Sequence, residues 1–295
     1  MPLVDLSAEP LPQLAPRRAD SHKGDFGRVL ILGGSRGMAG APSLTAMATL
    51  RSGAGLVTVA TPVSVQPTVA AFSPCYMTLP LVEDDYGIAD LANVVDLSEA
   101  RQRFDVWAIG PGLGQSEGVA ELVAQLYREV PRPMVVDADG LNALATVLKR
   151  NPQLLLNPAG VRILTPHPGE FARLSSRAPG SSTSERAEWA AELCARDSSG
   201  KTVVILKGYQ SIVCDGRRFA VNRTGNPGMA TGGTGDCLTG VVAALLGQGL
   251  DAWSAARLGA HVHGLAGDIA AEELGQVSLV ASDLLTYLPQ AFKSL

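Results

Sequence analysis

Residues 226–236 combine glycines with a carboxylate in a pattern that suits phosphate chemistry: they read Asn-Pro-Gly-Met-Ala-Thr-Gly-Gly-Thr-Gly-Asp. Glycines let backbone N–H groups approach an anion closely. The apolar run at 237–247 predicts a helix, whose first turn adds unpaired N–H donors and a positive dipole end. Asp236 then places a carboxylate beside an anion site, which fits a base that takes a proton from a hydroxyl attacking phosphorus. The alternative is that Asp236 caps the helix after a flexible loop.

Two further glycine-rich loops, at residues 33–40 and 110–114, each follow a strand-like run. The first differs in glycine spacing from the G-x-G-x-x-G dinucleotide fingerprint, and the next strand ends in Ala60, Thr61 and Pro62 instead of an acidic residue. We therefore expect a loop that closes over a ligand rather than a Rossmann site. The second loop supplies exposed backbone, which fits a wall for a flat or phosphorylated ligand, or a simple strand-to-helix turn.

Acidic and imidazole side chains follow two other strand-like runs. Asp137 and Asp139 suit magnesium bound through water, or a ligand hydroxyl; the alternative is a turn with an N-cap at Asp139. His167 lies in the segment Thr-Pro-His-Pro-Gly-Glu, where prolines on both sides stiffen the chain and are expected to suppress helix. We expect the imidazole to contact a ligand and Glu170 to organise metal or phosphate; the alternative is a solvent-exposed loop.

Lys207 ends another strand-like run and is followed by Gly-Tyr-Gln-Ser. A lysine at a strand end can bind phosphate as a point charge. The backbone that follows and the Ser211 hydroxyl can hold a nucleotide. The motif is common, so its meaning depends on where the fold places it.

The elements that must position these motifs alternate along the chain from residue 28. β-type runs lie at 28–32, 56–60, 105–109, 134–136, 161–164 and 203–206; helical runs lie at 42–52, 117–129, 185–196, 234–247 and 251–273. A hairpin is expected from 211–214 and 218–221, which an Asp-Gly pair separates. This alternation predicts an α/β fold with a mostly parallel sheet and helices on both faces. Ligands of such sheets bind outside the carboxyl ends of the strands, where nearly all the motifs above are expected to meet.

Composition limits the class of protein. The chain has 295 residues, of which 46% are hydrophobic and 18% charged, which fits a globular protein with a substantial core. The net charge of −4 and scattered basic residues predict no nucleic-acid partner. Apolar runs stay shorter than the roughly 18 residues of a membrane span, so no membrane is expected. Four widely spaced cysteines (75, 194, 214 and 237) predict reduced thiols in the cytoplasm, and no zinc site.

The two ends of the chain differ in character. Residues 1–20 are rich in proline and aperiodic, which predicts a tail or a covering arm. Acidic residues and prolines interrupt this segment, so it lacks the apolar core of a signal peptide. From residue 21 to residue 295 the composition shows no break of domain size and no internal repeat. We therefore predict one domain over 21–295.

Taken in order, these motifs closely resemble the ADP-dependent NAD(P)H-hydrate dehydratases, which have a ribokinase-like fold. The matching segments lie at 33–41, 51–57, 110–114, 137–144, 165–170, 207–208 and 228–240. Each is unspecific, but their combination and order are specific, and the resemblance extends over residues 21–295. The epimerase domain often fused to this family is not expected within this chain, so a separate NAD(P)H-hydrate epimerase would act with it.

The resemblance implies a repair reaction. Hydration of the nicotinamide ring makes NADH and NADPH useless as hydride donors. The family removes that water from the S-epimer by using ADP as co-substrate, and it releases AMP, phosphate and NAD(P)H. Phosphate is a good leaving group and hydroxide is not, so phosphorylation of the ring hydroxyl makes the elimination possible. Magnesium is the expected cofactor, and a homotetramer is the expected assembly.

The resemblance also assigns roles to residues. Asp236 is the catalytic base, and with Ala41, Gly114 and His167 it contacts the hydrated dinucleotide. ADP and AMP are bound by Gly235 and by the segment Lys207, Gly208, Tyr209, Gln210 and Ser211. The anion hole for the transferred phosphoryl group consists of Gly232, Gly233, Thr234 and Gly235, through backbone N–H groups. Glu170 organises magnesium and phosphate indirectly.

Two other functions stay open. A small-molecule kinase of the same fold, such as a vitamin-precursor kinase, would share the anion loop and Asp236 but release a stable phosphorylated product. A non-catalytic nucleotide-binding protein would have no need of Asp236. The segments 33–41 and 165–170 resemble the dehydratases more closely than the kinases, which favours the repair reaction.

Overall fold

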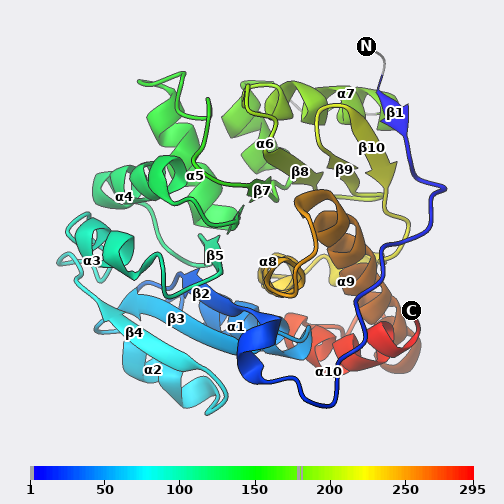
Figure 1. Cartoon of the computed structure of the whole chain (residues 1–295), viewed down its shortest axis with the longest axis horizontal. Helices are drawn as coiled ribbons and strands as arrows, with labels where there is room; N and C mark the ends of the chain where they lie inside the picture. The colour runs from blue at the N-terminus through cyan, green and yellow to red at the C-terminus, as the bar shows by residue number, and fades with distance from the viewer. Residues whose placement is uncertain (1–2, 178–179, 181) are drawn as a thin grey trace.

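A computed structural model describes residues 3–177, 180 and 182–295, and its centre is one sheet of ten strands (Figure 1). The strands are β1 (Val4–Asp5), β2 (Arg28–Leu32), β3 (Leu56–Pro62), β4 (Met77–Leu81), β5 (Val106–Ile109), β6 (Met134–Val136), β7 (Arg162–Leu164), β8 (Thr202–Leu206), β9 (Ile212–Cys214) and β10 (Arg218–Val221). Their order across the sheet is β1-β10-β9-β8-β7-β6-β5-β2-β3-β4. Only β9 runs against its neighbours, within the hairpin predicted from the Asp-Gly turn. The predicted α/β architecture with a mostly parallel sheet is confirmed.

Helices cover both faces of this sheet. They are α1 (Gly40–Arg51), α2 (Gln66–Phe72), α3 (Asn93–Ala100), α4 (Glu117–Glu129), α5 (Ala138–Leu148), α6 (Pro168–Ser175), α7 (Thr183–Cys194), α8 (Thr234–Gly247), α9 (Ala252–Leu274) and α10 (Ala281–Lys293), with 3₁₀ turns η1 (Lys23–Phe26) and η2 (Pro227–Met229). Helices α1, α8, α9 and α10 enclose one core, and α3 to α7 enclose the other. None of the helices in the described ranges is long and apolar enough to cross a bilayer.

The short parallel strands are mostly apolar because each side of the sheet faces a core. In β2, Val29 and Ile31 join the core under α1 and α8, whereas Leu30 and Leu32 join the core under α4 and α5. All four are fully buried. This explains the continuous apolar runs in the sequence, since strands buried on both faces need not alternate with polar residues.

Helix α8 lies at the centre of the molecule and packs tightly against α1 (Figure 1). A Cβ atom built on Gly240 would lie 2.3 Å from the carbonyl oxygen of Thr45, so only glycine permits this approach. Every residue from Cys237 to Leu246 is buried. The close packing fixes the N-terminal turn of α8, and with it Asp236, relative to the carboxyl ends of the strands.

The N-terminal segment lies along the outside of the molecule. Its strand β1 pairs in parallel with β10, and Leu6, Leu11 and Leu14 pack against the core that α8 to α10 enclose. Arg257 of α9 donates a hydrogen bond to the carbonyl oxygen of Glu9 at 2.8 Å. Met1 and Pro2 lie outside the described residues. The division of the chain at residue 20 stays a prediction.

Candidate active site

The carboxyl ends of four neighbouring strands bring the predicted residues to one rim of the sheet. Ile109 of β5 aligns with Val136 of β6, and Val136 in turn aligns with Leu164 of β7. The residues after these strands, and Lys207 after β8, therefore emerge side by side. The N-terminus of α8 reaches the same rim, because a Cβ atom built on Gly235 would lie 3.2 Å from Nζ of Lys207.

The first turn of α8 is built around Gly233, which occupies the N-cap position with a φ of 95°. Gly233 has no space for a side chain, since a Cβ atom there would lie 2.7 Å from a methyl of Leu44. No side chain caps the helix within the described part of the chain, so its first N–H groups are available to an anion. Asp236 is the third residue of the helix rather than its cap. The alternative reading of Asp236 as the N-cap is therefore wrong.

Two side chains, those of Thr234 and His263, hold the loop before α8 and the first residue of the helix in place. The Thr234 hydroxyl donates to the carbonyl oxygens of Met229 at 3.0 Å and Thr231 at 3.1 Å. His263 of α9 donates from Nε2 to the carbonyl oxygen of Thr234 at 2.8 Å. Burial lowers the pKa of His263 to about 4, so its imidazole stays neutral at physiological pH. The sequence offered no signal for this histidine, whose partner lies 29 residues away.

Lys207 forms an ion pair with Asp137, for which the sequence analysis predicted magnesium or a ligand hydroxyl as partner. Its Nζ atom lies 2.7 Å from Oδ1 of Asp137 and 3.8 Å from Oε2 of Glu170. The second oxygen of Asp137 accepts a hydrogen bond from the Thr239 hydroxyl of α8 at 2.7 Å. Burial opposes the charge on Lys207, but Asp137, Glu170 and Asp236 outweigh it and raise the pKa of the amine. A cation is thus held directly beneath the N-terminus of α8.

Asp236 has the electrostatic character of a base that works near neutral pH. Burial raises its pKa from 3.8 to about 7, and the neighbouring Asp137 adds to this rise. Lys207 acts in the opposite direction, while Asp139 and Glu170 raise the pKa further. A carboxyl with a pKa near 7 can both take up and release a proton under working conditions.

His167 and Glu170 form the start of α6. Nδ1 of His167 accepts hydrogen bonds from the N–H groups of Gly169 at 2.9 Å and Glu170 at 3.3 Å, and the Glu170 carboxylate accepts from the His167 N–H at 2.8 Å. The expectation that the flanking prolines suppress helix is wrong: Pro168 is the first helical residue, where its missing N–H costs nothing. Because Nδ1 accepts, the proton lies on Nε2, 3.3 Å from Oε1 of Glu170.

Burial shifts the pKa values of His167 and Glu170 in opposite directions, and in both cases it favours the neutral form. It lowers the pKa of His167, with Lys207 contributing, and it raises the pKa of Glu170 against the effect of Lys207. The imidazole is half-exposed at 49% and the carboxylate only 5% exposed, so the histidine faces the rim and the glutamate lies behind it. His167 therefore presents a half-exposed imidazole at the rim, where a ligand could contact it.

The candidate dinucleotide contacts Ala41, in the first turn of α1, and Gly114, in the loop after β5, belong to neighbouring segments that touch. A Cβ atom built on Gly112 would lie 3.0 Å from the Cβ atom of Ala41, and the Ser35 hydroxyl donates to the Gly112 carbonyl at 2.9 Å. The N–H group of Gly114 donates to Oδ2 of Asp139 at 2.9 Å. Asp139 therefore positions the loop at 110–114.

The alternative reading of Asp139 as a helix cap is wrong. Asp137 occupies the N-cap position of α5, and Asp139 is the second helical residue. The carboxylate of Asp139 accepts from the N–H group of Gly114 in the loop after β5, and it caps no backbone N–H group of its own helix within the described residues. The two aspartates that looked like a pair in the sequence thus serve different neighbours.

The candidate nucleotide loop at 207–211 contains two residues with positive φ, and a side chain of helix α7 stabilises it. Gly208 has a φ of 140° and Gln210 a φ of 53°. Arg186 of α7 donates to the carbonyl oxygens of Tyr209 at 2.7 Å and Gln210 at 3.2 Å. The Ser211 hydroxyl donates to the Gly208 carbonyl at 3.1 Å, and Tyr209 is 87% exposed. Sequence reasoning missed Arg186, because a single arginine in an amphipathic helix carries no signal for such a contact.

The carboxylates of the rim fit a magnesium ion that arrives with nucleotide phosphates. Within the described residues, no three His, Cys, Asp or Glu side chains are grouped to hold a metal ion by themselves. Asp137 is engaged by Lys207 and Thr239, while Glu170 is engaged by His167. Magnesium typically keeps several waters and binds through one or two carboxylates plus substrate phosphates.

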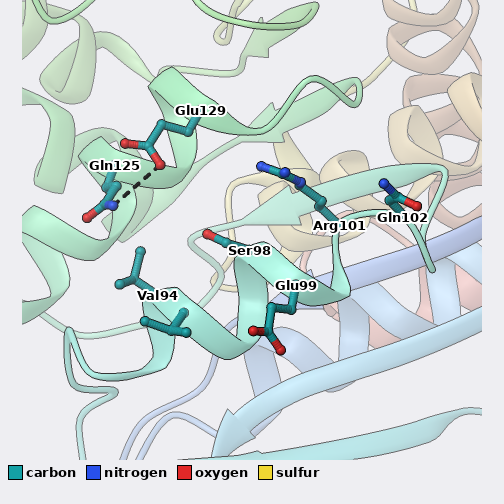
Figure 2. A pocket seen from close by; sticks show the side chains of 8 residues that line it. Val94, Ser98, Glu99, Arg101, Gln102, Gln125 and Glu129 are labelled. Carbon is teal, nitrogen blue, oxygen red and sulfur yellow. Dashed lines mark hydrogen bonds between the residues drawn. The ribbon is translucent and has the colours of Figure 1, made fainter.

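A separate groove lies between α3 and α4 and has a volume of about 610 Å³ (Figure 2). Its lining combines valines with acidic, amide and arginine side chains: Val94, Val95, Ser98, Glu99, Arg101, Gln102, Gln125 and Glu129. These residues belong to the two helices and to the turn after α3, and none of them follows the carboxyl end of a strand. The groove is therefore distinct from the rim described above.

Comparisons of the sequence with protein families and with curated proteins identify the same group of relatives. A family model described as NAD(P)H-hydrate dehydratase matches residues 29–290. The bifunctional NAD(P)H-hydrate repair enzyme Nnr of Moorella thermoacetica is 45% identical over 285 residues, which are 96% of this chain and 52% of that protein. The chain thus spans about half the length of the curated relatives it matches.

Solved structures agree with this relationship. The ADP/ATP-dependent NAD(P)H-hydrate dehydratase of Bacillus subtilis, co-crystallised with ATP and Mg²⁺, is 31% identical with a TM-score of 0.78, covering 95% of this chain and 94% of that one. Ribokinase of Arabidopsis thaliana is 12% identical with a TM-score of 0.56, covering 89% of this chain and 98% of that one. The second likeness concerns the fold alone, and it confirms the expected ribokinase-like architecture.

Proposed function

This chain belongs to the NAD(P)H-hydrate dehydratase family, and we propose that it dehydrates the S-epimer of hydrated NADH and NADPH with ADP as co-substrate. The products are NAD(P)H, AMP and phosphate. One observation carries the proposal: Asp236, with a pKa of about 7, lies in the first turn of an uncapped helix above the amine of Lys207. A base, an anion hole and a cation therefore meet at one point of the rim.

In the first step, a phosphoryl group moves from ADP to the dinucleotide. Asp236 takes the proton of the ring hydroxyl as its oxygen attacks the β-phosphorus. The new P–O bond forms as the bond to AMP breaks, and AMP carries away the electron pair. Backbone N–H groups of Gly232, Gly233, Thr234 and Gly235 hold the phosphoryl oxygens, and Lys207 balances their charge. His263, through the Thr234 carbonyl, keeps these donors in position.

In the second step, phosphate leaves the ring. The lone pair of the ring nitrogen expels phosphate by breaking the C–O bond, and loss of a proton from the neighbouring carbon restores the dihydropyridine. Phosphate needs little further help to leave once it is formed. The protein therefore has to orient the ring and exclude competing water, and Ala41, Gly114 and His167 are the residues we assign to this task.

Nucleotide and metal occupy the side of the rim next to β8. We assign ADP and AMP to Lys207, Gly208, Tyr209, Gln210, Ser211 and Gly235. The exposed ring of Tyr209 and the open backbone of the loop support this assignment. Magnesium would bind the ADP phosphates, with Glu170 acting through water, and would supply neutralisation of phosphate charge. The relative co-crystallised with ATP and Mg²⁺ supports the choice of metal.

The remaining parts of the proposal concern the setting of the enzyme. Four cysteines occur as free thiols, which supports a reducing compartment such as the cytoplasm. Assembly as a homotetramer and cooperation with a separate NAD(P)H-hydrate epimerase rest on the family resemblance. Hydrated NADH or NADPH and ADP are the proposed small-molecule partners.

The decisive experiment incubates the purified protein with hydrated NADH, ADP and magnesium. We expect the near-ultraviolet absorbance of dihydronicotinamide to return while AMP forms in equal amount. A phosphorylated dinucleotide that accumulates without dehydration would favour the kinase alternative, and nucleotide binding without turnover would favour the non-catalytic one. Asp236→Asn should retain ADP binding and lose turnover by about a hundredfold to ten-thousandfold, the range for general bases. Near-normal turnover in this variant would exclude Asp236 as the base.

A further inference from the structure

We propose that Arg173 binds a phosphate group of the hydrated dinucleotide, in a subsite between Gly114 and His167. The inference rests on the proposed function, because it requires the dinucleotide to contact these two residues. Three properties of the guanidinium carry it: the direction that α6 gives the side chain, the contacts that hold it, and the donors that stay free.

Helix α6 directs Arg173 toward the rim. Side chains of a helix lean toward its N-terminus, over the residue four positions earlier, which here is Gly169. A Cβ atom built on Gly169 would lie 3.8 Å from Nη1 of Arg173 and 2.9 Å from Cε1 of His167. The guanidinium therefore lies beside the half-exposed imidazole. Its charge is one cause of the lowered pKa of His167, after burial and Lys207.

A chain of hydrogen bonds connects Arg173 with Gly114. Nε of Arg173 donates to Oδ1 of Asn142 at 2.9 Å, and Nδ2 of Asn142 donates to Oδ1 of Asp139 at 3.3 Å. Oδ2 of Asp139 accepts from the N–H group of Gly114 at 2.9 Å. This network joins α6, the first turn of α5 and the loop after β5. It holds the guanidinium in the space that the two candidate dinucleotide contacts border.

Most donors of Arg173 remain free for a ligand. A guanidinium has five N–H donors, and here the bond from Nε to Asn142 is its single hydrogen bond within residues 3–177, 180 and 182–295. The side chain is exposed and forms no ion pair in those ranges. The two terminal nitrogens form a planar fork that matches two phosphate oxygens.

The negative charge of the rim would repel anionic substrates, so a positively charged side chain at the surface would help to bind them. Both proposed substrates are anionic, and the rim presents four carboxylates, those of Asp137, Asp139, Glu170 and Asp236. Lys207 is largely buried and already paired with Asp137, so it offers little attraction at the surface. An exposed arginine with free donors can attract an incoming dinucleotide.

The position of Arg173 favours the dinucleotide over ADP. The proposed ADP contacts lie on the loop after β8 and on α8. The network of Arg173 involves α5, α6 and the loop after β5 instead. Two phosphate sources on the dinucleotide share this chemistry: the central diphosphate, and the 2′-phosphate that only the NADPH form carries.

The test compares wild type with Arg173→Gln, Arg173→Lys and the control Arg51→Gln, which removes one exposed positive charge at the far end of α1. Steady-state rates are measured with hydrated NADH and hydrated NADPH at saturating ADP, at low and high salt. Arg173→Gln should raise the KM for the dinucleotide by about tenfold to a hundredfold, the range for hydrogen bonds to charged groups. The kcat and the KM for ADP should stay at the wild-type level, and the salt dependence of the dinucleotide KM should weaken. Arg173→Lys should fall between, since it keeps the charge and loses the fork.

Each outcome decides between named alternatives. An equal rise in KM for both dinucleotides assigns Arg173 to the diphosphate, and a rise confined to hydrated NADPH assigns it to the 2′-phosphate. An unchanged dinucleotide KM, a rise in the KM for ADP instead, or a fall in kcat alone overturns the inference. Wild type without turnover would instead refute the proposed function. In that case, binding of NADPH to the same variants, followed by its own fluorescence, still tests Arg173.

Discussion

Replacing Asp236 with asparagine should stabilise the protein while it lowers turnover by about a hundredfold to ten-thousandfold. Burial among other carboxylates raises the pKa of Asp236 from 3.8 to about 7. The folded protein therefore retains a proton on this group between about pH 4 and pH 7 that the unfolded chain has released. Stability of the wild type falls as pH rises through this window, because the folded state binds more protons there. Above pH 7 the loss is complete.

The magnitude follows from the size of the pKa change. A rise from 3.8 to about 7 corresponds to about 4 kcal/mol at about 1.4 kcal/mol per pKa unit, as an upper limit for a group with some access to solvent. Asparagine fills a similar volume and never carries the charge. The gain in unfolding free energy should thus rise from about 1 kcal/mol at pH 4.5, where the unfolded aspartate is already mostly ionised, to about 4 kcal/mol at pH 8.5.

Urea unfolding, followed by tryptophan fluorescence from pH 4.5 to pH 8.5, measures this difference directly. Other groups titrate equally in the two proteins, so their contributions cancel in the comparison. Asp96→Asn, at an exposed aspartate of α3, controls for the loss of one carboxylate. A difference between Asp236→Asn and wild type that stays constant with pH, or a less stable variant at pH 8.5, would refute the electrostatic reasoning.

Three further predictions address the base, the nucleotide loop and the anion hole. The acidic limb of the pH dependence of kcat/KM should have its midpoint near pH 7, because Asp236 must be deprotonated to act; a limb below pH 5 would contradict this role. Arg186→Gln should raise the KM for ADP by about tenfold, since its hydrogen bonds to the loop after β8 are lost, and an unchanged KM for ADP would remove that function. Gly233→Ala should destabilise the fold by about 2 kcal/mol or more and lower kcat, because its φ is 95° and its side-chain space is filled. The control Gly249→Ala, with a φ of 92° and open space around it, should retain kcat, and equal losses of kcat in both variants would refute the argument.

The sheet and its rim could be predicted from sequence because both depend on local patterns. Short apolar runs such as 134–136 are strands buried on both faces, and a polar residue at the end of such a run must emerge at the rim. Because the carboxyl ends of the parallel strands meet at one edge of the sheet, these residues are predicted to lie close together once the strands are assigned. Asp137 and Lys207 were recognised in this way, each as the first residue after a strand.

The pairing of these residues could not be predicted, because it depends on distances between separate elements. Asp137 and Lys207 are 70 residues apart, and the sequence suggested magnesium or a hydroxyl for one and phosphate for the other. The capping role of His167 was missed for a different reason. Proline was taken as a helix breaker, although at the first position of a helix its fixed φ favours the helical conformation.

The central position of α8 has a consequence for the motions of the protein. The residues from Cys237 to Leu246 are buried between α1, α9 and the sheet, so their amide hydrogens should exchange with solvent only when the whole fold opens. Asp236, the proposed base, is attached to the start of this slowly exchanging segment. Under the proposed function, we therefore expect the fluctuations that admit and release substrates in the loops around Asp236, at 33–40, 110–114 and 207–211, while the carboxylate of Asp236 keeps its position.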